Sequence, residues 1–250
     1  MGGQAPGPAG CGRHGGLIPV IELHREVAVI ALRAAARHGF ALGGGNALMA
    51  HGVIDRFTAD VDLFTDREAG VAAAADAVEA ALHDAGFEAD RQDKASGLAD
   101  IFEGMGEGLA EWIITAPAGE QMMLQMAYFD RGHQPVIMEF GPVLDLDDVL
   151  GGKVAALASR AAERDYIDVA AALARGYSVA RLTGLAVTLD PGLTAEDFAD
   201  AGQRLDRLGD DRFARYGLTP EDVTRLRAQF AAWPRTPGPV PGLPGSSPPS

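Results

Sequence analysis

The pattern of the chain changes near residue 144, and this change constrains the fold more than any other feature of the sequence. Before it, short apolar runs of strand length alternate with helical segments. After it, helical periodicity continues almost to the end of the chain. The sequence therefore predicts an α/β (α+β) fold, in which a mixed half over residues 19–143 precedes an all-helical half over residues 144–233.

Local signals place individual elements within the two halves. In the first half, we expect helices over residues 19–38, 47–51 and 70–85, and strands over residues 40–42, 59–64, 87–91, 110–115, 122–129 and 136–140. In the second half, we expect helices over residues 146–162, 164–174, 178–187, 194–205 and 219–233. The predicted helix N-caps include Asn46, Asp145, Thr194 and Thr219.

The two ends of the chain differ from the rest in composition. Residues 1–18 are mostly Gly, Pro and Ala, and residues 234–250 read PRTPGPVPGLPGSSPPS. Neither end carries enough apolar surface to offset the entropy lost on ordering, so we expect two disordered tails. The single cysteine, Cys11, lies in the first tail, which excludes an intrachain disulfide and a cysteine-based metal site.

The charge balance limits the partners of the chain. There are 21 Lys and Arg residues against 35 Asp and Glu residues, which gives a net charge of −14. This argues against a protein that coats nucleic acid non-specifically or binds anionic membranes, although it is compatible with a local basic site. The sequence has no apolar run of about 18 residues and no signal-peptide pattern, so we expect a cytoplasmic protein.

A glycine run, Gly43 to Gly45, followed by Asn46, lies between a predicted strand and a predicted helix. Glycines at such a turn allow a phosphate to approach the backbone, and the N–H groups at the start of a helix attract an anion. The same run is also typical of a tight turn with no ligand. The motif is therefore compatible with phosphate binding without establishing it.

Asp60 and Asp62 lie two residues apart in a predicted strand, so both side chains face the same side of the sheet. Val61, Leu63 and Phe64 are apolar, which indicates that the strand is partly buried. Two carboxylates on a half-buried face repel each other unless a cation joins them. We therefore predict a site for a hard divalent cation such as Mg²⁺, and the alternative is an exposed acidic strand face.

A segment rich in charge, from Lys153 to Asp168, is the third candidate. If one helix ran through it, Lys153, Arg160 and Arg164 would lie within roughly 20° of one another around the helix axis. A break near Glu163 would remove this argument from helix phase but could still bring the groups together. The alternative is an internal ion-pair network, for example between Arg164 and Asp168.

The remaining polar residues give weaker signals. The histidines have no metal-ligand spacing, and His51, which follows the glycine run, is expected to fill a core or capping position rather than contact a ligand. Ser159 has no His or Asp companion at a recognisable spacing. A nucleophilic triad is therefore not supported.

In their order along the chain, the three motifs resemble one protein family. FALGGGNALMAHGVIDRFTADVDLF is similar to the segment GG-x-AL … R-x-T/S-x-D-[IV]-D-L of the AbiEii/AbiGii-type nucleotidyltransferase toxins. KVAALASRAAERDYIDVAAL resembles a later segment of that family, K-x2-AL-x2-R-x3-RD-x2-D-L. The resemblance spans about residues 38–175 and implies a nucleotidyltransferase fold, with a small mixed sheet flanked by helices and a helical C-terminal part.

The resemblance also implies roles for the residues that match the family motifs. Asp60 and Asp62 would hold Mg²⁺ or Mn²⁺. The residues that would bind the nucleotide are Gly44, Gly45, Asn46, Arg56, Thr58 and Lys153, of which Lys153 would contact the triphosphate. The supporting residues would be Arg160, Arg164, Asp165 and Asp168.

One position departs from the wider superfamily, which supplies a third metal carboxylate from a later strand. The expected location is the strand over residues 122–129, where Gln125 occupies the middle and cannot act as a base. Three alternatives stay open: Asp130 or Glu139 substitutes, the enzyme works with two carboxylates, or transfer activity has been lost.

The combined motifs favour a Mg²⁺-dependent enzyme that transfers a nucleoside monophosphate from an NTP to an RNA (for example tRNA), protein or small-molecule acceptor. The family resemblance adds a possible toxin role and therefore a cognate antitoxin as partner, with no membrane. The alternative from another class is a catalytically inactive nucleotide- or partner-binding protein on the same fold. A sugar-nucleotide transferase would suit Asp60 and Asp62 but would leave the segment from Lys153 to Asp168 unexplained.

Overall fold

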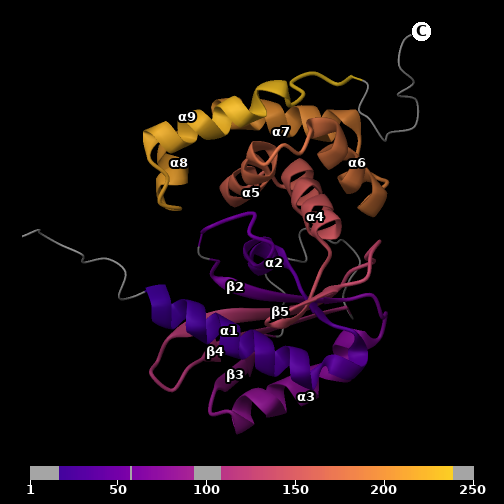
Figure 1. Cartoon of the computed structure of the whole chain (residues 1–250), viewed down its shortest axis with the longest axis vertical. Coiled ribbons are helices and arrows are strands. Elements are labelled where there is room, and N and C mark those ends of the chain that lie inside the picture. The colour runs from indigo at the N-terminus through magenta and orange to yellow at the C-terminus, as the bar shows by residue number, and fades with distance from the viewer. Residues whose placement is uncertain (1–16, 57, 93–107, 239–250) are drawn as a thin grey trace, which may run out of the picture.

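The computed structural model describes residues 17–56, 58–92 and 108–238. Most of both predicted tails lies outside these ranges. Figure 1 shows a sheet between two groups of helices. Helices α1 (Leu17–Ala34) and α3 (Gly70–Asp84) pack together on one face of the sheet, while α2 (Gly44–Ala50) contacts β2 and the first helix of the C-terminal part.

The sheet has seven strands in the order β3-β4-β5-β2-β1-β7-β6. Its strands are β1 (Ala41–Leu42), β2 (Asp60–Thr65), β3 (Glu88–Arg91), β4 (Leu109–Thr115), β5 (Gln121–Tyr128), β6 (Val136–Met138) and β7 (Gly141–Val143). The pairs β2–β5 and β1–β7 are parallel and the other pairs are antiparallel, so the sheet is mixed, as the sequence predicted.

Side chains alternate along β2, and this alternation determines which face of the sheet is apolar and which is acidic. Val61, Leu63 and Thr65 are completely buried, and the Thr65 hydroxyl donates a hydrogen bond to the carbonyl of His38 below the sheet. Asp60 and Asp62 occupy the alternate positions and are only partly buried. β2 therefore turns its apolar side to α1 and its acidic side to the C-terminal helices.

The C-terminal part contains only helices: α4 (Leu146–Ser159), α5 (Glu163–Ala174), α6 (Val179–Leu189), α7 (Ala195–Arg207), α8 (Asp211–Ala214) and α9 (Pro220–Gln229). The predicted caps Asp145, Thr194 and Thr219 are confirmed, because each side chain accepts a hydrogen bond from a backbone N–H in the first turn of its helix. Aromatic rings join the helices, with Tyr166 and Phe230 at 5.6 Å between centroids.

Three local predictions were wrong, each for a physical reason. One strand was expected over residues 136–140, but β6 ends at Met138 and the chain turns back at once into β7, which pairs with β6 and β1. The short helix α8 was not predicted, since four residues carry too little periodicity. The helix expected over residues 146–162 ends at Ser159, because Ala161 adopts a left-handed φ of 50°.

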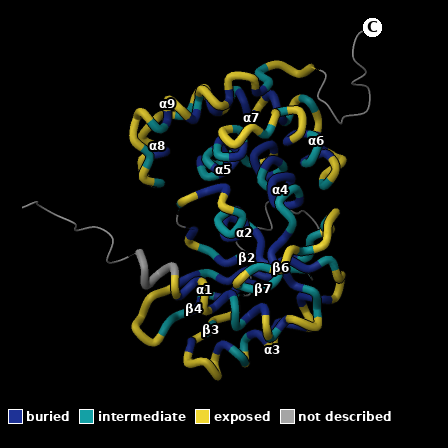
Figure 2. The backbone as a smooth tube through the Cα atoms, viewed as in Figure 1, coloured by how far each residue is buried: buried dark blue, intermediate teal, exposed yellow. Residues whose placement is uncertain are grey.

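Burial is continuous between the two halves. Figure 2 shows buried backbone in the sheet and in α4, which stands directly above it. One hydrophobic cluster contains Leu63 and Leu124 of the sheet as well as Leu157 and Phe198 of the helices. Within the described ranges, no helix combines the length and the apolar character that crossing a membrane requires.

Candidate active site

A cleft of about 640 Å³ lies between the acidic face of β2 and the helices α4 and α5. Nine of the residues predicted from the sequence line it: Gly44, Gly45, Arg56, Thr58, Asp60, Asp62, Lys153, Arg160 and Arg164. Three others, Asn46, Asp165 and Asp168, are buried behind its walls. A larger hollow of about 1290 Å³ lies against α1 and the β6–β7 hairpin, and Glu139 is the one candidate residue from the sequence that lines it.

The side chains of β2 and of the segment before it explain the three glycines of the turn. A Cβ atom on Gly43 would lie 2.2 Å from the ring of Phe64, and one on Gly45 would lie 2.3 Å from Cγ2 of Thr58. A Cβ atom on Gly44 would lie 1.8 Å from Oδ2 of Asp62, and Gly44 also has a left-handed φ of +57°. The turn therefore packs directly against the Asp62 carboxylate.

Asn46 has a different role from the one predicted. The helix begins at Gly44 with Gly43 as its N-cap, so the expectation that Asn46 caps a helix over residues 47–51 was wrong. Instead, Asn46 Nδ2 donates a hydrogen bond of 2.7 Å to the carbonyl of Asp60. This bond fastens α2 to the start of β2 and helps to fix the position of the acidic pair.

Asp60 and Asp62 face the cleft together. Burial raises the pKa of Asp62, the positive charge of Lys153 opposes this shift, and the negative charge of Asp60 adds to it. Arg164 Nη1 lies 3.8 Å from Asp60 Oδ2. Two oxygen-bearing side chains that repel each other at the floor of a cleft match the needs of a hard divalent cation.

The buried carboxylate of Asp168 forms ion pairs with two basic side chains of the cleft. Lys153 Nζ lies 2.8 Å from Asp168 Oδ2, and Arg56 Nη2 lies 2.6 Å from Asp168 Oδ1. Asp168 is fully buried, so it keeps both cations at the wall of the cleft. The internal ion-pair network considered from the sequence is therefore present. Only its example was wrong, because Arg164 pairs with Asp60 and not with Asp168.

The break between α4 and α5 places the remaining basic residues. Arg160 donates two hydrogen bonds to Asp165, at 2.9 and 3.0 Å, and the backbone N–H of Ala162 donates to the same carboxylate. The single helix considered from the sequence is therefore interrupted, and its phase argument does not apply. The bend still brings Arg160 and Arg164 to the same cleft as Lys153.

Among the cleft residues that were not predicted from the sequence, two come from a distant segment. Arg215 and Tyr216, which follow α8, line the cleft opposite β2. Glu163 at the start of α5 is buried and pairs with Arg212 at 2.6 Å and with Arg215, which anchors the α8 segment there. No local motif signals this contact, since about 50 residues of chain separate its partners.

Neither acid considered as a replacement for the missing carboxylate lies in the cleft. Asp130 is exposed, and Glu139 is 72% exposed and pairs with Arg25. Gln125 does line the cleft and pairs in register with Asp62. The buried acid nearest to this position is Glu111, which accepts a hydrogen bond from Gln125 Nε2 and which the sequence did not single out.

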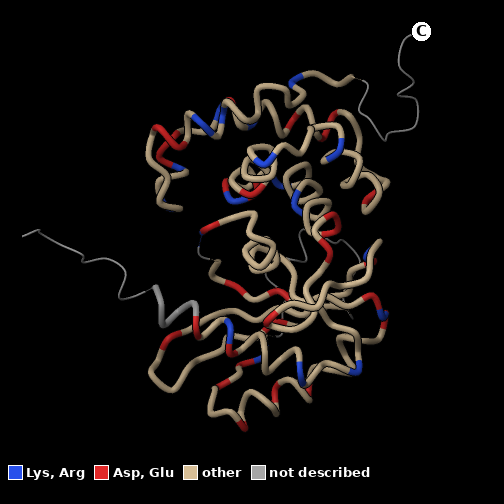
Figure 3. Tube along the Cα trace, viewed as in Figure 1, with Lys and Arg blue, Asp and Glu red and all other residues tan. Residues whose placement is uncertain are grey.

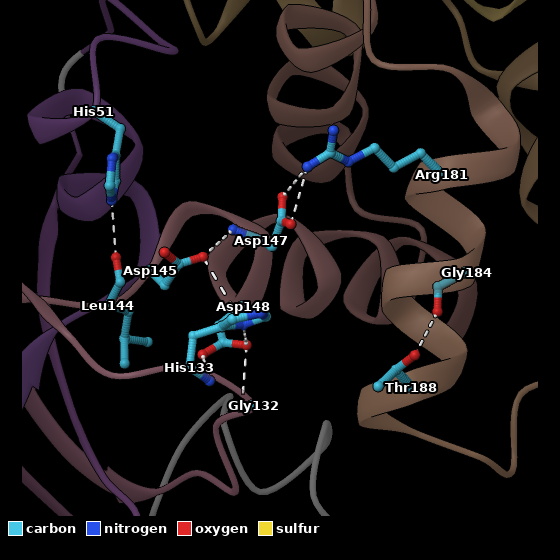
Figure 4. A network of polar contacts seen from close by, with 10 residues as sticks. All are labelled: His51, Gly132, His133, Leu144, Asp145, Asp147, Asp148, Arg181, Gly184 and Thr188. Carbon is cyan, nitrogen blue, oxygen red and sulfur yellow. Dashed lines mark hydrogen bonds and ion pairs between the residues drawn. The ribbon is translucent and has the colours of Figure 1, made fainter.

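A second group of acids lies at the start of α4 (Figure 4). Ligand atoms of His133, Asp145 and Asp147 lie within 4.8 Å of one another. Each carboxylate already binds protein groups, since Asp145 caps α4 and Asp147 accepts from Arg181 at 2.9 and 3.0 Å. We therefore assign these acids to the folding of α4. His51 is the partly buried C-cap of α2, and its Nε2 lies 2.8 Å from the carbonyl of Leu144, so of the core or capping position expected for it the capping one is confirmed.

Comparison with known proteins gives one family. The family model described as "Nucleotidyl transferase AbiEii toxin, Type IV TA system" matches residues 30–232. No curated protein sequence matches.

Solved structures give the same fold. MenT4, a nucleotidyltransferase toxin from Mycobacterium tuberculosis, is 15% identical with a TM-score of 0.53, over 84% of this chain and 82% of that chain. A candidate nucleotidyltransferase from Helicobacter pylori is 16% identical with a TM-score of 0.52, over 84% of this chain and 92% of that chain. At these identities the likeness concerns the fold alone.

Proposed function

Because the chain belongs to the AbiEii family of nucleotidyltransferase toxins, we propose that its cleft transfers a nucleoside monophosphate from an NTP to an acceptor. One observation carries this proposal: the glycine turn packs against the Asp62 carboxylate, at the floor of a cleft that basic side chains surround. Phosphate groups and a cation would meet at this point.

The donor set fits a divalent cation. Asp60 and Asp62 would hold Mg²⁺ or Mn²⁺, and a bound cation would neutralise charge that develops on the phosphate oxygens. The raised pKa of Asp62 means that its negative charge is unfavourable without a counter-charge. The Thr58 hydroxyl is buried beside Gly45 and has no hydrogen-bond partner among the described residues, so it can donate to a ligand oxygen.

The basic residues would bind and orient the triphosphate. Lys153, Arg160 and Arg164 come from the helices, and Arg56 precedes β2. Lys153 is the only lysine within the described ranges, and Asp168 fixes the position of its ammonium group. A positioned charge that strengthens its contact as the reaction proceeds lowers the barrier.

In the proposed reaction, an acceptor hydroxyl attacks the α-phosphorus of the NTP. A bond forms between the acceptor oxygen and phosphorus, and the bond from the α-phosphorus to the oxygen that bridges to the β-phosphate breaks. Pyrophosphate leaves with the electrons of that bond, and the hydroxyl proton passes to a base. The acceptor would be an RNA such as tRNA, a protein or a small molecule, and a cognate antitoxin would control the activity.

Incubation of the protein with α-³²P-labelled NTPs and cell extract tests the proposal. We expect label to enter one class of acceptor only when Mg²⁺ or Mn²⁺ is present. NTP binding without any transfer would instead support the inactive nucleotide-binding protein. Transfer from a labelled nucleotide sugar but not from an NTP would support a sugar-nucleotide transferase.

A further inference from the structure

One aromatic side chain of the cleft has no role in the function proposed above. Among the described residues, three aromatic residues line the cleft: Phe64, Phe129 and Tyr216. The rings of Phe64 and Phe129 pack together at 5.4 Å between centroids, and both residues lie in or against the hydrophobic cluster. Phe213 and Leu218 also contact this cluster, but Tyr216 between them does not. Packing of the core therefore does not explain why an aromatic residue occupies position 216.

The guanidinium of Arg215 shows where the Tyr216 ring lies. Arg215 Cζ is 5.1 Å from the centroid of this ring, and Arg215 forms an ion pair with Glu163 at the start of α5. The next residue of that helix is Arg164, whose Nη1 lies 3.8 Å from Asp60 Oδ2. The Tyr216 ring therefore lies at the end of the cleft where α5 approaches the acidic pair. Within the described ranges, no second aromatic ring packs against it.

The turn that carries Tyr216 is held in place from two directions. Phe213 is completely buried, and its carbonyl accepts a hydrogen bond of 3.0 Å from the backbone N–H of Tyr216. The Glu163 carboxylate is only 5% exposed and pairs with both Arg212 and Arg215. A buried carboxylate needs such partners, so these two pairs fasten the turn to α5. A side chain on an ordered turn loses little further freedom when a ligand binds, which favours binding.

We infer that Tyr216 is the surface on which the nucleobase of the NTP stacks. The base and the triphosphate belong to one molecule, so the base lies in the same cleft as the acidic pair and the glycine turn. An aromatic ring accepts any base, because every base has a π-face, and removal of such a ring lowers affinity about tenfold. This inference rests on the proposed function, because it takes the ligand of the cleft to be an NTP.

Isothermal titration calorimetry of the full chain tests the inference, with the Mg²⁺ complexes of the four NTPs and of inorganic tripolyphosphate as probes. Tripolyphosphate carries three linked phosphates but no base, so it reports the phosphate and cation contacts alone. We expect Tyr216→Ala to weaken binding of the NTP that the wild type prefers by about tenfold and to leave tripolyphosphate binding unchanged. Wild-type NTP affinity in Tyr216→Ala, or an equal loss for tripolyphosphate, would overturn the inference.

Two matched variants serve as controls. Tyr216→Phe keeps the π-face and removes only the hydroxyl, so it should recover the NTP affinity lost in Tyr216→Ala. Tyr177 forms the same kind of pair, with Arg181 Cζ 5.0 Å from its ring centroid, but it does not line the cleft. Tyr177→Ala should therefore keep the wild-type NTP affinity. A loss in Tyr216→Phe or in Tyr177→Ala as large as that in Tyr216→Ala would assign the effect to the hydroxyl or to folding and would overturn the inference.

Transfer assays with labelled NTP separate this inference from the proposed function. If the wild type transfers label and Tyr216→Ala binds NTP as tightly as the wild type does, only the inference fails. If NTP binding depends on Tyr216 but no label is transferred, only the proposed reaction fails. If Tyr216→Ala keeps its NTP affinity and raises the KM of the acceptor, the ring serves the acceptor and the inference is overturned.

Discussion

Asp62 carries its charge in unfavourable surroundings. Burial raises its pKa above the ordinary value of 3.8, so the folded protein holds the proton to a higher pH than the unfolded chain does. Its ionisation therefore costs stability as the pH rises from about 4 through the folded pKa, and the full cost is present above that pKa. The charge of Asp62 lowers the stability of the fold at neutral pH, so the fold does not explain why an acid occupies this position. A cation bound by Asp62 does explain it.

We predict that Asp62→Asn raises the thermal midpoint of the metal-free protein at pH 7 and lowers nucleotidyl transfer by at least about 100-fold. The gain in stability should shrink as the pH falls toward 4, because Asp62 becomes neutral there in the wild type. Calorimetry across this pH range and a transfer assay provide the two measurements. Full activity in both Asp60→Asn and Asp62→Asn would rule out the acidic pair as the reacting centre.

We predict that Lys153→Ala raises the KM for NTP and lowers kcat, because a phosphate contact that strengthens in the transition state affects both. Lys153→Arg should recover only part of the activity, since a planar guanidinium does not replace a compact ammonium group. Steady-state kinetics at saturating metal separates the two constants. A change in thermal stability alone, with unchanged nucleotide binding and turnover, would show that Lys153 serves only its pair with Asp168.

The residues that the sequence could predict are those whose spacing is local. Asp60 and Asp62 share a face because strands alternate, and this follows from two positions of one strand. Arg215 and Tyr216 could not be found in this way. They reach the cleft through a contact between distant segments, and no periodic pattern marks them.

At the scale of the element, the turn before α2 is the most constrained part of the site. Gly44 and Gly52 both adopt a left-handed φ, of +57° and +68°, but a Cβ atom would have a neighbour within 4 Å only at Gly44. The two positions therefore form a matched pair. Alanine introduces the same backbone strain at both positions, and a clash with Asp62 at only one of them.

We predict that Gly52→Ala destabilises the fold by about 1 kcal/mol and leaves transfer unchanged. Gly44→Ala should cost about 1–3 kcal/mol more, because the Asp62 carboxylate must move, and it should abolish transfer. Denaturant unfolding of both variants, with transfer assays, measures the difference. Equal destabilisation and equal activity would show that the turn does not position Asp62.

The elements were predicted well where the signal was a periodic pattern or a cap, as at Asp145, Thr194 and Thr219. They were predicted less well where tertiary contacts decide the outcome. The start of α2 depends on the packing of Gly44 against Asp62, and the end of α4 depends on the pairing of Arg160 with Asp165. Neither contact is visible in a local window of sequence.

For the whole molecule, the net charge of −14 contrasts with the basic residues of the cleft. Figure 3 shows acidic and basic residues interspersed along α8 and α9. Several of these arginines are already paired, as in Arg225–Asp222 and Arg227–Asp210. The surface around the cleft therefore offers few free cations for a nucleic-acid backbone.

We predict that an RNA acceptor is held only at its end, through few phosphates, with micromolar or weaker affinity. Each phosphate contact steepens the dependence of affinity on salt, so few contacts give a shallow slope. Binding of bulk tRNA between about 50 and 200 mM salt measures both quantities. Nanomolar affinity with a steep slope would show a basic surface that the charge distribution does not predict.

The central claim is that this cleft cleaves an NTP between its α- and β-phosphates and transfers the α-phosphate with its nucleoside. The most direct measurement compares α-³²P- and γ-³²P-labelled NTP in parallel reactions with the wild type and Asp62→Asn. The account predicts that the wild type attaches the α-label to an acceptor and releases the γ-label as pyrophosphate, and that Asp62→Asn does neither. Attachment of the γ-label, or equal transfer of the α-label by Asp62→Asn, would contradict it.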